Sequence, residues 1–257
     1  MNRIEGKRVL ITGASSGIGK ACAVAFAQHR ASLILTARRG ERLATLAEGL
    51  RREHGVEVAT HVLDVRDRPA VLDFARALEA DGLVPDVLVN NAGLAAGLTK
   101  LHEGSFEDWD RMIDTNVKGL LNASRAVLPL MVARNSGHVV NLGSIAGHLV
   151  YPNGNVYNAT KFAVRALNEA MNLDLVGTRI RVSSIDPGAV QTEFSLVRFA
   201  GDKARAAKVY EGYVPLRPED IAEAVIFVVN APEHVNVQQM VVMPTAQRSS
   251  YVLHRES

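Results

Sequence analysis

The chain has 257 residues, of which 47% are hydrophobic and 22% are charged, and its formal net charge is +2. This balance is typical of a globular protein, and the nearly equal numbers of acidic and basic residues argue against a nucleic-acid-binding protein. The single cysteine, Cys22, excludes an intrachain disulfide; we expect it to pack inside the first helix. Scattered histidines give no zinc-ligand cluster, so we expect no metal site.

The N-terminal run MNRIEGKRVLITG lacks the apolar core of a secretory signal, and no apolar run reaches the length of a membrane span. We therefore expect a cytoplasmic protein that does not enter membranes.

Short apolar runs alternate along the chain with helix-length amphipathic stretches. Runs rich in Val, Ile and Leu suit parallel strands that are covered on both faces. The repeated β-α-β order predicts an α/β fold over 1–257: a single-domain, doubly wound Rossmann fold with a seven-stranded parallel sheet and helices on both faces. The predicted strands are 8–12, 32–36, 56–63, 87–90, 137–142, 180–185 and 236–242. The predicted helices are 17–29, 41–53, 69–80, 106–132, 156–175 and 218–229.

Two segments depart from this alternation. Residues 193–213 follow a strand end and carry mixed charge without a clear period, which suggests a lid over a site. Residues 244–257 form a polar C-terminal tail. The sequence leaves open whether this tail is disordered or docks on a neighbouring subunit.

Three glycines, Gly13, Gly17 and Gly19, stand where the first strand passes into the first helix. Glycines at such a junction let backbone amides approach a phosphate, and the helix N-terminus adds a partial positive charge. The spacing is GxxxGxG rather than GxGxxG, so the position between strand and helix gives the motif its weight. The alternative is an ordinary turn without a ligand.

The same residues also match GxSxG, the nucleophile elbow of hydrolases. That chemistry needs an acid and a histidine at later strand ends. Asp64 and Asp186 are candidate acids, but no later histidine has a convincing position, which disfavours a hydrolase.

The end of the second strand carries Arg38 and Arg39, where proteins that bind NAD place an acidic residue for the ribose 2′-hydroxyl. Guanidinium groups bind phosphate bidentately and stack on adenine. The sequence therefore predicts NADP(H) rather than NAD(H). The alternative is that both arginines are only solvent-exposed residues where the next helix begins.

Tyr157 and Lys161 are four residues apart in a predicted helix, so both project from one face. A nearby ammonium favours the tyrosinate and lowers the tyrosine pKa, which suits proton exchange with a substrate oxygen. Ser144, Asn90–Gly93 and Asp186–Gly188 follow the fifth, fourth and sixth strands, at the sheet edge where open α/β sheets bind ligands. This clustering gives the otherwise common YxxxK pattern its meaning.

With these residues the sequence resembles the short-chain dehydrogenase/reductase family over nearly its whole length. The resemblance rests on TGASSGIG at 12–19, Asp64, NNAG at 90–93, Asn116, Ser144, the Tyr157/Lys161 pair, and Pro187-Gly188 with Thr192.

The resemblance implies hydride transfer between a nicotinamide and a carbonyl or alcohol carbon. It implies that Tyr157 is the general acid/base, and that Lys161 lowers the pKa of this tyrosine and binds the nicotinamide ribose. It also implies that Ser144 holds the substrate oxygen and that Asn116 anchors a water for proton relay. The alternative for Asn116 is a polar residue that only stabilises its helix.

By the same resemblance, Asp64 contacts adenine, Asn91 and Gly93 contact the adenosine side, and residues 187–192 contact the nicotinamide end. The alternative for Asp64 is a cap of the helix near Pro69. The predicted cofactor-binding residues are Gly13, Ser15, Ser16, Gly17, Ile18, Gly19, Arg38, Arg39, Asp64, Val65, Asn91, Ala92, Gly93, Tyr157, Lys161, Pro187, Gly188, Val190 and Thr192.

The C-terminal half resembles one branch more closely, the bacterial 3-hydroxy acid (serine/allo-threonine) dehydrogenases, and is also similar to sulfoacetaldehyde reductases. The resemblance implies use of NADP and a homotetramer. It rests on NVY at 155–157, TEFS at 192–195 with VRF at 197–199, PED at 218–220, PEHVN at 232–236 and MPT at 243–245.

An acidic substrate needs a cation near Tyr157. Arg198 in the expected lid is the first candidate and Arg248 in the tail the second, while Tyr151 lines the pocket together with Ser144 and Tyr157. The alternative for Arg198 is a solvated lid charge. We expect an NADP-dependent oxidoreductase of a small hydroxy or oxo compound, such as a 3-hydroxy acid, a semialdehyde or sulfoacetaldehyde. A reductase of neutral aldehydes or ketones, and a non-catalytic NADP-binding sensor, remain as alternatives.

Overall fold

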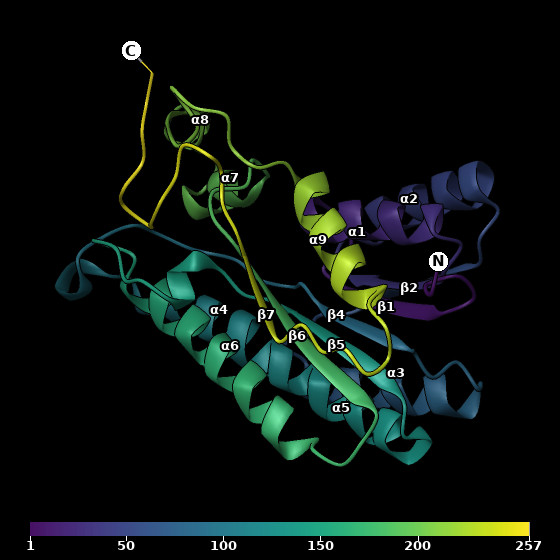
Figure 1. The fold of residues 1–257 in the computed structure, drawn as a ribbon. Helices are drawn as coiled ribbons and strands as arrows, with labels where there is room; N and C mark the ends of the chain where they lie inside the picture. The colour runs from purple at the N-terminus through teal and green to yellow at the C-terminus, as the bar shows by residue number, and fades with distance from the viewer. Residues whose placement is uncertain (257) are drawn as a thin grey trace.

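Seven parallel strands form one sheet in the computed structural model, which describes residues 1–256 (Figure 1). The chain builds β1, β2 and β3 outward in one direction, then returns to place β4 on the other side of β1. This reversal between β1 and β4 is the point where doubly wound sheets open a crevice for ligands. In spatial order the strands are β3 (Val58–Val62), β2 (Ser32–Ala37), β1 (Arg8–Thr12), β4 (Val87–Asn90), β5 (Gly137–Leu142), β6 (Ile180–Pro187) and β7 (Gln239–Val242).

Helices cover both faces of this sheet, as Figure 1 shows. Alternate residues of a strand point to opposite faces, so Val9 and Ile11 of β1 pack in one core and Leu10 packs in the other. The first core lies under α1 (Gly17–Gln28), α2 (Gly40–His54) and α9 (Pro218–Val229). The second lies under α3 (Arg68–Ala80), α5 (Leu120–Arg134) and α6 (Asn155–Asp174). The predicted single-domain Rossmann fold is confirmed.

The helix predicted at 106–132 is wrong in detail. The structure has α4 (Phe106–Ile113), a π-helical segment (Asp114–Gly119) and then α5, which ends at Arg134. A Cβ added to Gly119 would stand 2.6 Å from Cγ2 of Val65, so this segment lies tight against the loop after β3. The π-helical segment occurs where this packing is close, and the spacing of hydrophobic residues in the sequence does not reveal such contacts.

Some strand ends also differ from the prediction. β3 covers 58–62 rather than 56–63. β7 begins at Gln239 rather than at Asn236, whose side chain instead donates to Asn172 of α6. β6 continues to Pro187, whose ladder partner is Val242. Two short 3₁₀ turns, Leu101–Glu103 and Ile145–Gly147, lie in loops at the carboxyl side of the sheet.

The segment 193–213 holds two short helices, α7 (Phe194–Arg198) and α8 (Lys203–Lys208). The tail beyond β7 packs on its own chain. Gln247 accepts a hydrogen bond from the amide of Ala189, and the guanidinium of Arg255 donates to backbone carbonyls at Val209 and Glu211. Ser257, the last residue of the expected tail, lies outside the described residues.

Within residues 1–256, no helix combines the length and apolar character that crossing a bilayer requires. The same residues bring no three His, Cys, Asp or Glu side chains together in a metal-binding group. Cys22 is fully buried in α1, as expected, and burial raises the pKa of its thiol to about 12.

Candidate active site

A cavity of about 350 Å³ opens along the carboxyl edge of the sheet and collects side chains from most of its strands. Most of the predicted site residues line it. They are Gly13, Ser15, Ser16, Gly17, Ile18, Arg38, Arg39, Asp64, Val65, Asn91, Ala92, Gly93, Ser144, Tyr157, Lys161, Pro187, Gly188, Val190 and Thr192. The strand-end argument thus brought together residues that are up to about 180 positions apart in sequence.

Four predicted residues, Gly19, Asn116, Tyr151 and Arg198, are not among those lining the cavity. They lie just behind it: Gly19 under the glycine turn, Asn116 behind Gly93, and the other two beside Tyr157. Arg248, the second candidate cation, is in the tail and also does not line the cavity.

The glycine turn is held by Asn91 at the end of β4. Its side-chain amide donates to the carbonyls of Thr12 and Gly13, at 2.9 and 3.2 Å. Gly13 has a φ of +68°, and a Cβ at Gly19 would stand 2.4 Å from that amide nitrogen. Glycine is therefore required for both conformation and space. In this structure the side chain of Asn91 supports the turn.

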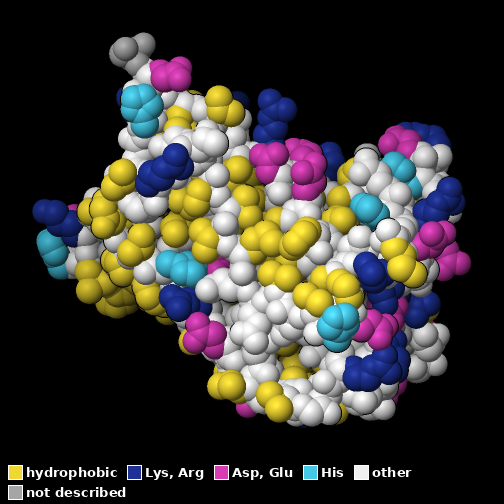
Figure 2. Space-filling model, in the orientation of Figure 1, with side chains coloured by type: hydrophobic (Ala, Val, Ile, Leu, Met, Phe, Trp, Pro, Cys, Tyr) yellow, Lys and Arg dark blue, Asp and Glu magenta, His cyan; other side chains and the backbone are white. Residues whose placement is uncertain are grey.

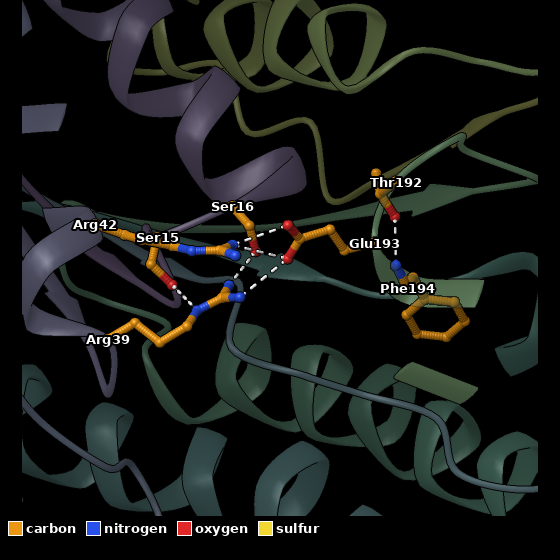
Figure 3. Close-up of polar contacts among 7 residues, drawn as sticks. All are labelled: Ser15, Ser16, Arg39, Arg42, Thr192, Glu193 and Phe194. Carbon is orange, nitrogen blue, oxygen red and sulfur yellow. Dashed lines mark hydrogen bonds and ion pairs between the residues drawn. The ribbon is translucent and has the colours of Figure 1, made fainter. Parts of the chain in front are cut away.

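Arg39 lies across the two serines of the glycine turn (Figure 3). Its Nε donates to Oγ of Ser15 at 3.1 Å, and one terminal nitrogen donates to Oγ of Ser16 at 2.6 Å. The other terminal nitrogen pairs with the Glu193 carboxylate at 3.0 Å. Arg38 is exposed and lines the cavity beside it. Both arginines thus face the cavity, although Arg39 is also part of an ion-pair cluster.

Asp64 does not cap helix α3, because Asp67 accepts the capping bond from the amide of Ala70. Asp64 instead forms a bidentate pair with Arg66, which holds the pKa of its carboxyl below the ordinary range. Asp64 is one of the residues that line the cavity.

Tyr157 is buried at the substrate side of the cavity. The ring of Phe194 from α7 meets it edge-on, 5.5 Å between centroids, and the guanidinium of Arg198 lies 4.9 Å from its ring centre. Burial raises the pKa of Tyr157, while the Arg198 charge and the Ser144 hydroxyl lower it.

The expected effect of Lys161 on the pKa of Tyr157 stays a prediction. The ammonium of Lys161 is 6.0 Å from the tyrosine ring centre and donates to the carbonyl of Leu142 at 2.8 Å. Burial lowers the pKa of Lys161 itself to about 8, and the Asp186 carboxylate opposes this shift. Sequence spacing gave the helix face correctly but could not show which cation lies nearest the phenol.

Asp186 is almost fully buried near the end of β6, and its carboxylate contacts two polar side chains. Its carboxylate accepts from the Ser184 hydroxyl, and its second oxygen lies 2.7 Å from Nε2 of His148. A Cβ on Gly143 would stand 1.8 Å from the carboxylate, so glycine is required there. No strand-end pattern predicted His148 or Gly143 as part of the site.

Arg198 lies behind the cavity wall, among three aromatic rings. It donates to the Tyr151 hydroxyl at 2.5 Å and stacks against the rings of Tyr151, Tyr157 and Phe194. Its Nε is buried without a hydrogen-bond partner among the described residues. The alternative of a fully solvated lid charge is therefore wrong.

The side chain of Asn116 forms its hydrogen bonds with other residues of the protein. Its amide group donates to the Leu94 carbonyl and the Thr160 hydroxyl, and its oxygen accepts from the Leu94 amide at 2.8 Å. These bonds tie the π-helical segment to the loop after β4 and to α6. The geometry supports the structural alternative for this side chain.

The hydrolase alternative finds no support here. Ser15 accepts from the Arg39 guanidinium and has no histidine partner among the described residues, and Asp186 pairs with His148. Sequence reasoning missed ten cavity residues, among them Arg111, Thr115 and, from the segment 193–213, Glu193, Phe194 and Val197. The signal that could have found the last three was their place directly after Thr192.

The comparisons with known proteins agree with this geometry. The family model for short chain dehydrogenases matches residues 7–201, and the chain belongs to that family. The NADP-dependent 3-hydroxy acid dehydrogenase YdfG of Salmonella typhi is 50% identical over 240 residues, which is 93% of this chain and 95% of that one. The NADP-dependent 3-hydroxy acid dehydrogenase of Schizosaccharomyces pombe is 42% identical and covers 100% of this chain and 99% of its own.

Among solved structures, the closed form of serine dehydrogenase complexed with NADP+ superimposes with a TM-score of 0.90 at 46% identity. The match covers 97% of this chain and 100% of that one. Serine dehydrogenase from Escherichia coli gives a TM-score of 0.80 at 42% identity, covering 94% and 99%.

Proposed function

We propose that this protein is an NADP-dependent dehydrogenase/reductase that interconverts a small 3-hydroxy acid and its 3-oxo form. Serine, allo-threonine and 3-hydroxypropionate define the class, and sulfoacetaldehyde is its sulfonate counterpart. Curated relatives carry the name NADP-dependent 3-hydroxy acid dehydrogenase, and one solved neighbour is serine dehydrogenase with NADP+.

One observation supports the substrate class: Arg198 stands beside the ring of the buried Tyr157, and its Nε has no hydrogen-bond partner within residues 1–256. A guanidinium binds a carboxylate or sulfonate bidentately, and the pairing strengthens where water is excluded. A neutral aldehyde or ketone gives this cation nothing to bind, which makes the neutral-carbonyl reductase the second candidate.

The residues of the cavity fit NADP(H). Ser16 makes no side-chain cap at the N-terminus of α1, so the first amides of that helix remain for an anion, and the glycine turn leaves the approach open. Arg38 and Arg39 stand at the end of β2, in the place where proteins that bind NAD carry an acidic residue for the ribose hydroxyl. Bound NADPH supplies the hydride, and bound NADP+ accepts it.

The chain's own residues then orient the substrate and move the proton. The Tyr157 hydroxyl donates its proton to the carbonyl oxygen during reduction and takes it back during oxidation. The Ser144 hydroxyl donates a hydrogen bond to the same oxygen. Lys161 keeps two of its three N–H donors after bonding Leu142 and holds the nicotinamide ribose with them.

The segment 193–213 acts as the lid, because Phe194 and Arg198 of α7 close over Tyr157. The tail from 244 supports that lid through Arg255 and lies against the end of β6 through Gln247.

The proposal is tested by absorbance at 340 nm with paired substrates that differ only in the acidic group, each with NADP+ and NAD+. We expect turnover with NADP+ and 3-hydroxy acids, and a large loss for the matching neutral alcohols. The Tyr157→Phe variant should have no turnover but should still bind NADPH. A variant that binds NADPH with unchanged turnover would contradict the assignment of Tyr157, and wild-type binding without any turnover would favour the sensor.

We propose further that the enzyme is a cytoplasmic homotetramer. Figure 2 shows hydrophobic side chains gathered over the face that β7 and α9 share, where Phe227 is 62% and Val241 is 45% exposed. A second exposed apolar row follows α4 and α5, with Phe106, Ile113 and Leu121. Two such faces suit two isologous interfaces. Light scattering on the purified protein tests the assembly, and cell fractionation tests the location.

A further inference from the structure

Glu193 joins the lid to the cofactor end of the cavity. Its carboxylate lies 3.0 Å from a terminal nitrogen of Arg39 and 2.8 Å from a terminal nitrogen of Arg42 on α2 (Figure 3). Arg42 also reaches the second carboxylate oxygen, at 3.1 Å. One carboxylate thus holds two guanidinium groups together above the glycine turn.

This arrangement uses three of the five N–H donors of Arg39. Nε donates to Ser15, one terminal nitrogen donates to Ser16 and the other donates to Glu193. An incoming phosphate at Arg39 therefore meets the negative charge of the Glu193 carboxylate, which already pairs with Arg39 and Arg42. The ion pairs are about half exposed, so the exchange does not have to uncover a buried charge.

Glu193 is also the residue directly before α7. The next residue, Phe194, packs on Tyr157, and Arg198 at the end of the same helix stacks on that phenol. The contacts of Glu193 with Arg39 and Arg42 therefore fasten the lid at its cofactor end, while Phe194 and Arg198 fasten it at its substrate end.

We propose that Glu193 and Arg42 determine recognition of the cofactor's 2′-phosphate. Glu193 is a resident anion that leaves Arg39 and Arg42 when the phosphate binds, and Arg42 then serves as a third cation beside Arg38 and Arg39. This inference rests on the NADP preference proposed above. It adds two residues, from α2 and from the lid, that the strand-end pattern did not include.

The sign of the effect follows from the exchange. Because the Glu193 carboxylate competes with the phosphate for Arg39 and Arg42 and repels its charge, removing the Glu193 charge strengthens 2′-phosphate binding. Exposed ion pairs contribute little each, so we expect a gain of about twofold to tenfold. Arg42 contributes attraction to the dianionic phosphate, and its loss weakens binding by a similar factor.

The experiment is isothermal titration of the purified full chain with 2′,5′-ADP and, in parallel, with 5′-AMP, which lacks only the 2′-phosphate. Glu193→Gln should bind 2′,5′-ADP about twofold to tenfold more tightly and bind 5′-AMP as wild type does. Glu211→Gln removes a carboxylate from the same lid segment and serves as the matched control. Weaker or unchanged 2′,5′-ADP binding by Glu193→Gln would overturn the role of Glu193.

Arg42→Gln should weaken 2′,5′-ADP binding about twofold to tenfold without changing 5′-AMP binding. Arg52→Gln, near the other end of α2 and also in a surface ion pair, is the control for lost helix charge. Equal losses for the two nucleotides, or no loss, would overturn the role of Arg42. If the wild type itself does not prefer 2′,5′-ADP over 5′-AMP, the NADP proposal fails first, which separates the two outcomes.

Discussion

The guanidinium carbon of Arg198 lies 4.9 Å from the centre of the Tyr157 ring, although the two residues are 41 positions apart and belong to different helices. The contact places a cation where an acidic substrate needs one, and the same charge lowers the pKa of the phenol against the effect of burial. In the proposed function, Arg198 links substrate selection to proton transfer.

We expect Arg198→Met to lower kcat/KM for a 3-hydroxy acid about tenfold to a hundredfold, because one charge-assisted pairing contributes about 1.5–3 kcal/mol. Methionine keeps an apolar stem against the Tyr151 and Phe194 rings. Steady-state kinetics on an acid and on its neutral alcohol analogue give the comparison. An equal loss on both substrates would show that Arg198 acts only through the phenol or through packing.

Tyr151→Phe tests the same contact by a smaller change. It removes the hydroxyl that accepts from Arg198 but keeps the ring. We expect a smaller loss, in the same direction, confined to the acid substrate and expressed mainly in KM. Loss of turnover on both substrates would mean that Tyr151 holds the position of Tyr157 rather than that of Arg198.

The buried Lys161 gives folding stability a dependence on pH. Its pKa falls from 10.5 to about 8 on burial, so between these values the unfolded chain binds more protons at this site than the folded one. Stability from this group therefore rises with pH across that window, by at most about 1.4 kcal/mol per pH unit. Urea unfolding of wild type and Lys161→Met from below pH 8 to above pH 10.5 measures it.

We expect the stability difference in favour of Lys161→Met to be largest below pH 8 and to shrink as the pH rises. Lys118→Met removes an exposed lysine paired with Asp114 and reports the general effect of losing one amine. Parallel curves for wild type and Lys161→Met would contradict the depressed pKa of Lys161.

Gly143→Ala should destabilise the fold by about 1–3 kcal/mol, the usual cost of forcing extra volume into a packed place. The added methyl would collide with the buried Asp186 carboxylate and push the ends of β5 and β6 apart. Chemical denaturation measures the change. Gly49→Ala in α2 is the contrasting control, since its nearest atom is 3.9 Å away and alanine favours a helix by about 0.5–1 kcal/mol. Equal stability of the two variants would refute the close approach.

Arg38→Gln should raise the KM for NADPH about tenfold or more and leave the KM for NADH nearly unchanged, because Arg38 lines the cavity at the end of β2. Steady-state kinetics with both cofactors decide this. A comparable rise in KM for NADPH and NADH would show that Arg38 does not recognise the 2′-phosphate.

Much of the site was predictable because parallel strands end at one edge. Gly13, Arg38, Ser144 and Thr192 follow strand ends within a few residues, and the cavity lies at that edge. Side chains that act from behind a neighbour were not predictable in this way. Asn116 has a suitable position in the chain, yet its hydrogen bonds go to Leu94 and Thr160.

The sequence by itself determined the doubly wound sheet, the glycine turn, the pair of arginines after β2 and the spacing of Tyr157 and Lys161, since these depend on local period, turn chemistry and chain order. Only the tertiary structure decided which charges meet: Arg198 rather than Lys161 beside the phenol, Glu193 between Arg39 and Arg42, and Asp186 against Gly143. The physical reason is that electrostatic and steric contacts fall off within a few ångströms, and such distances between residues far apart in the chain are set by packing.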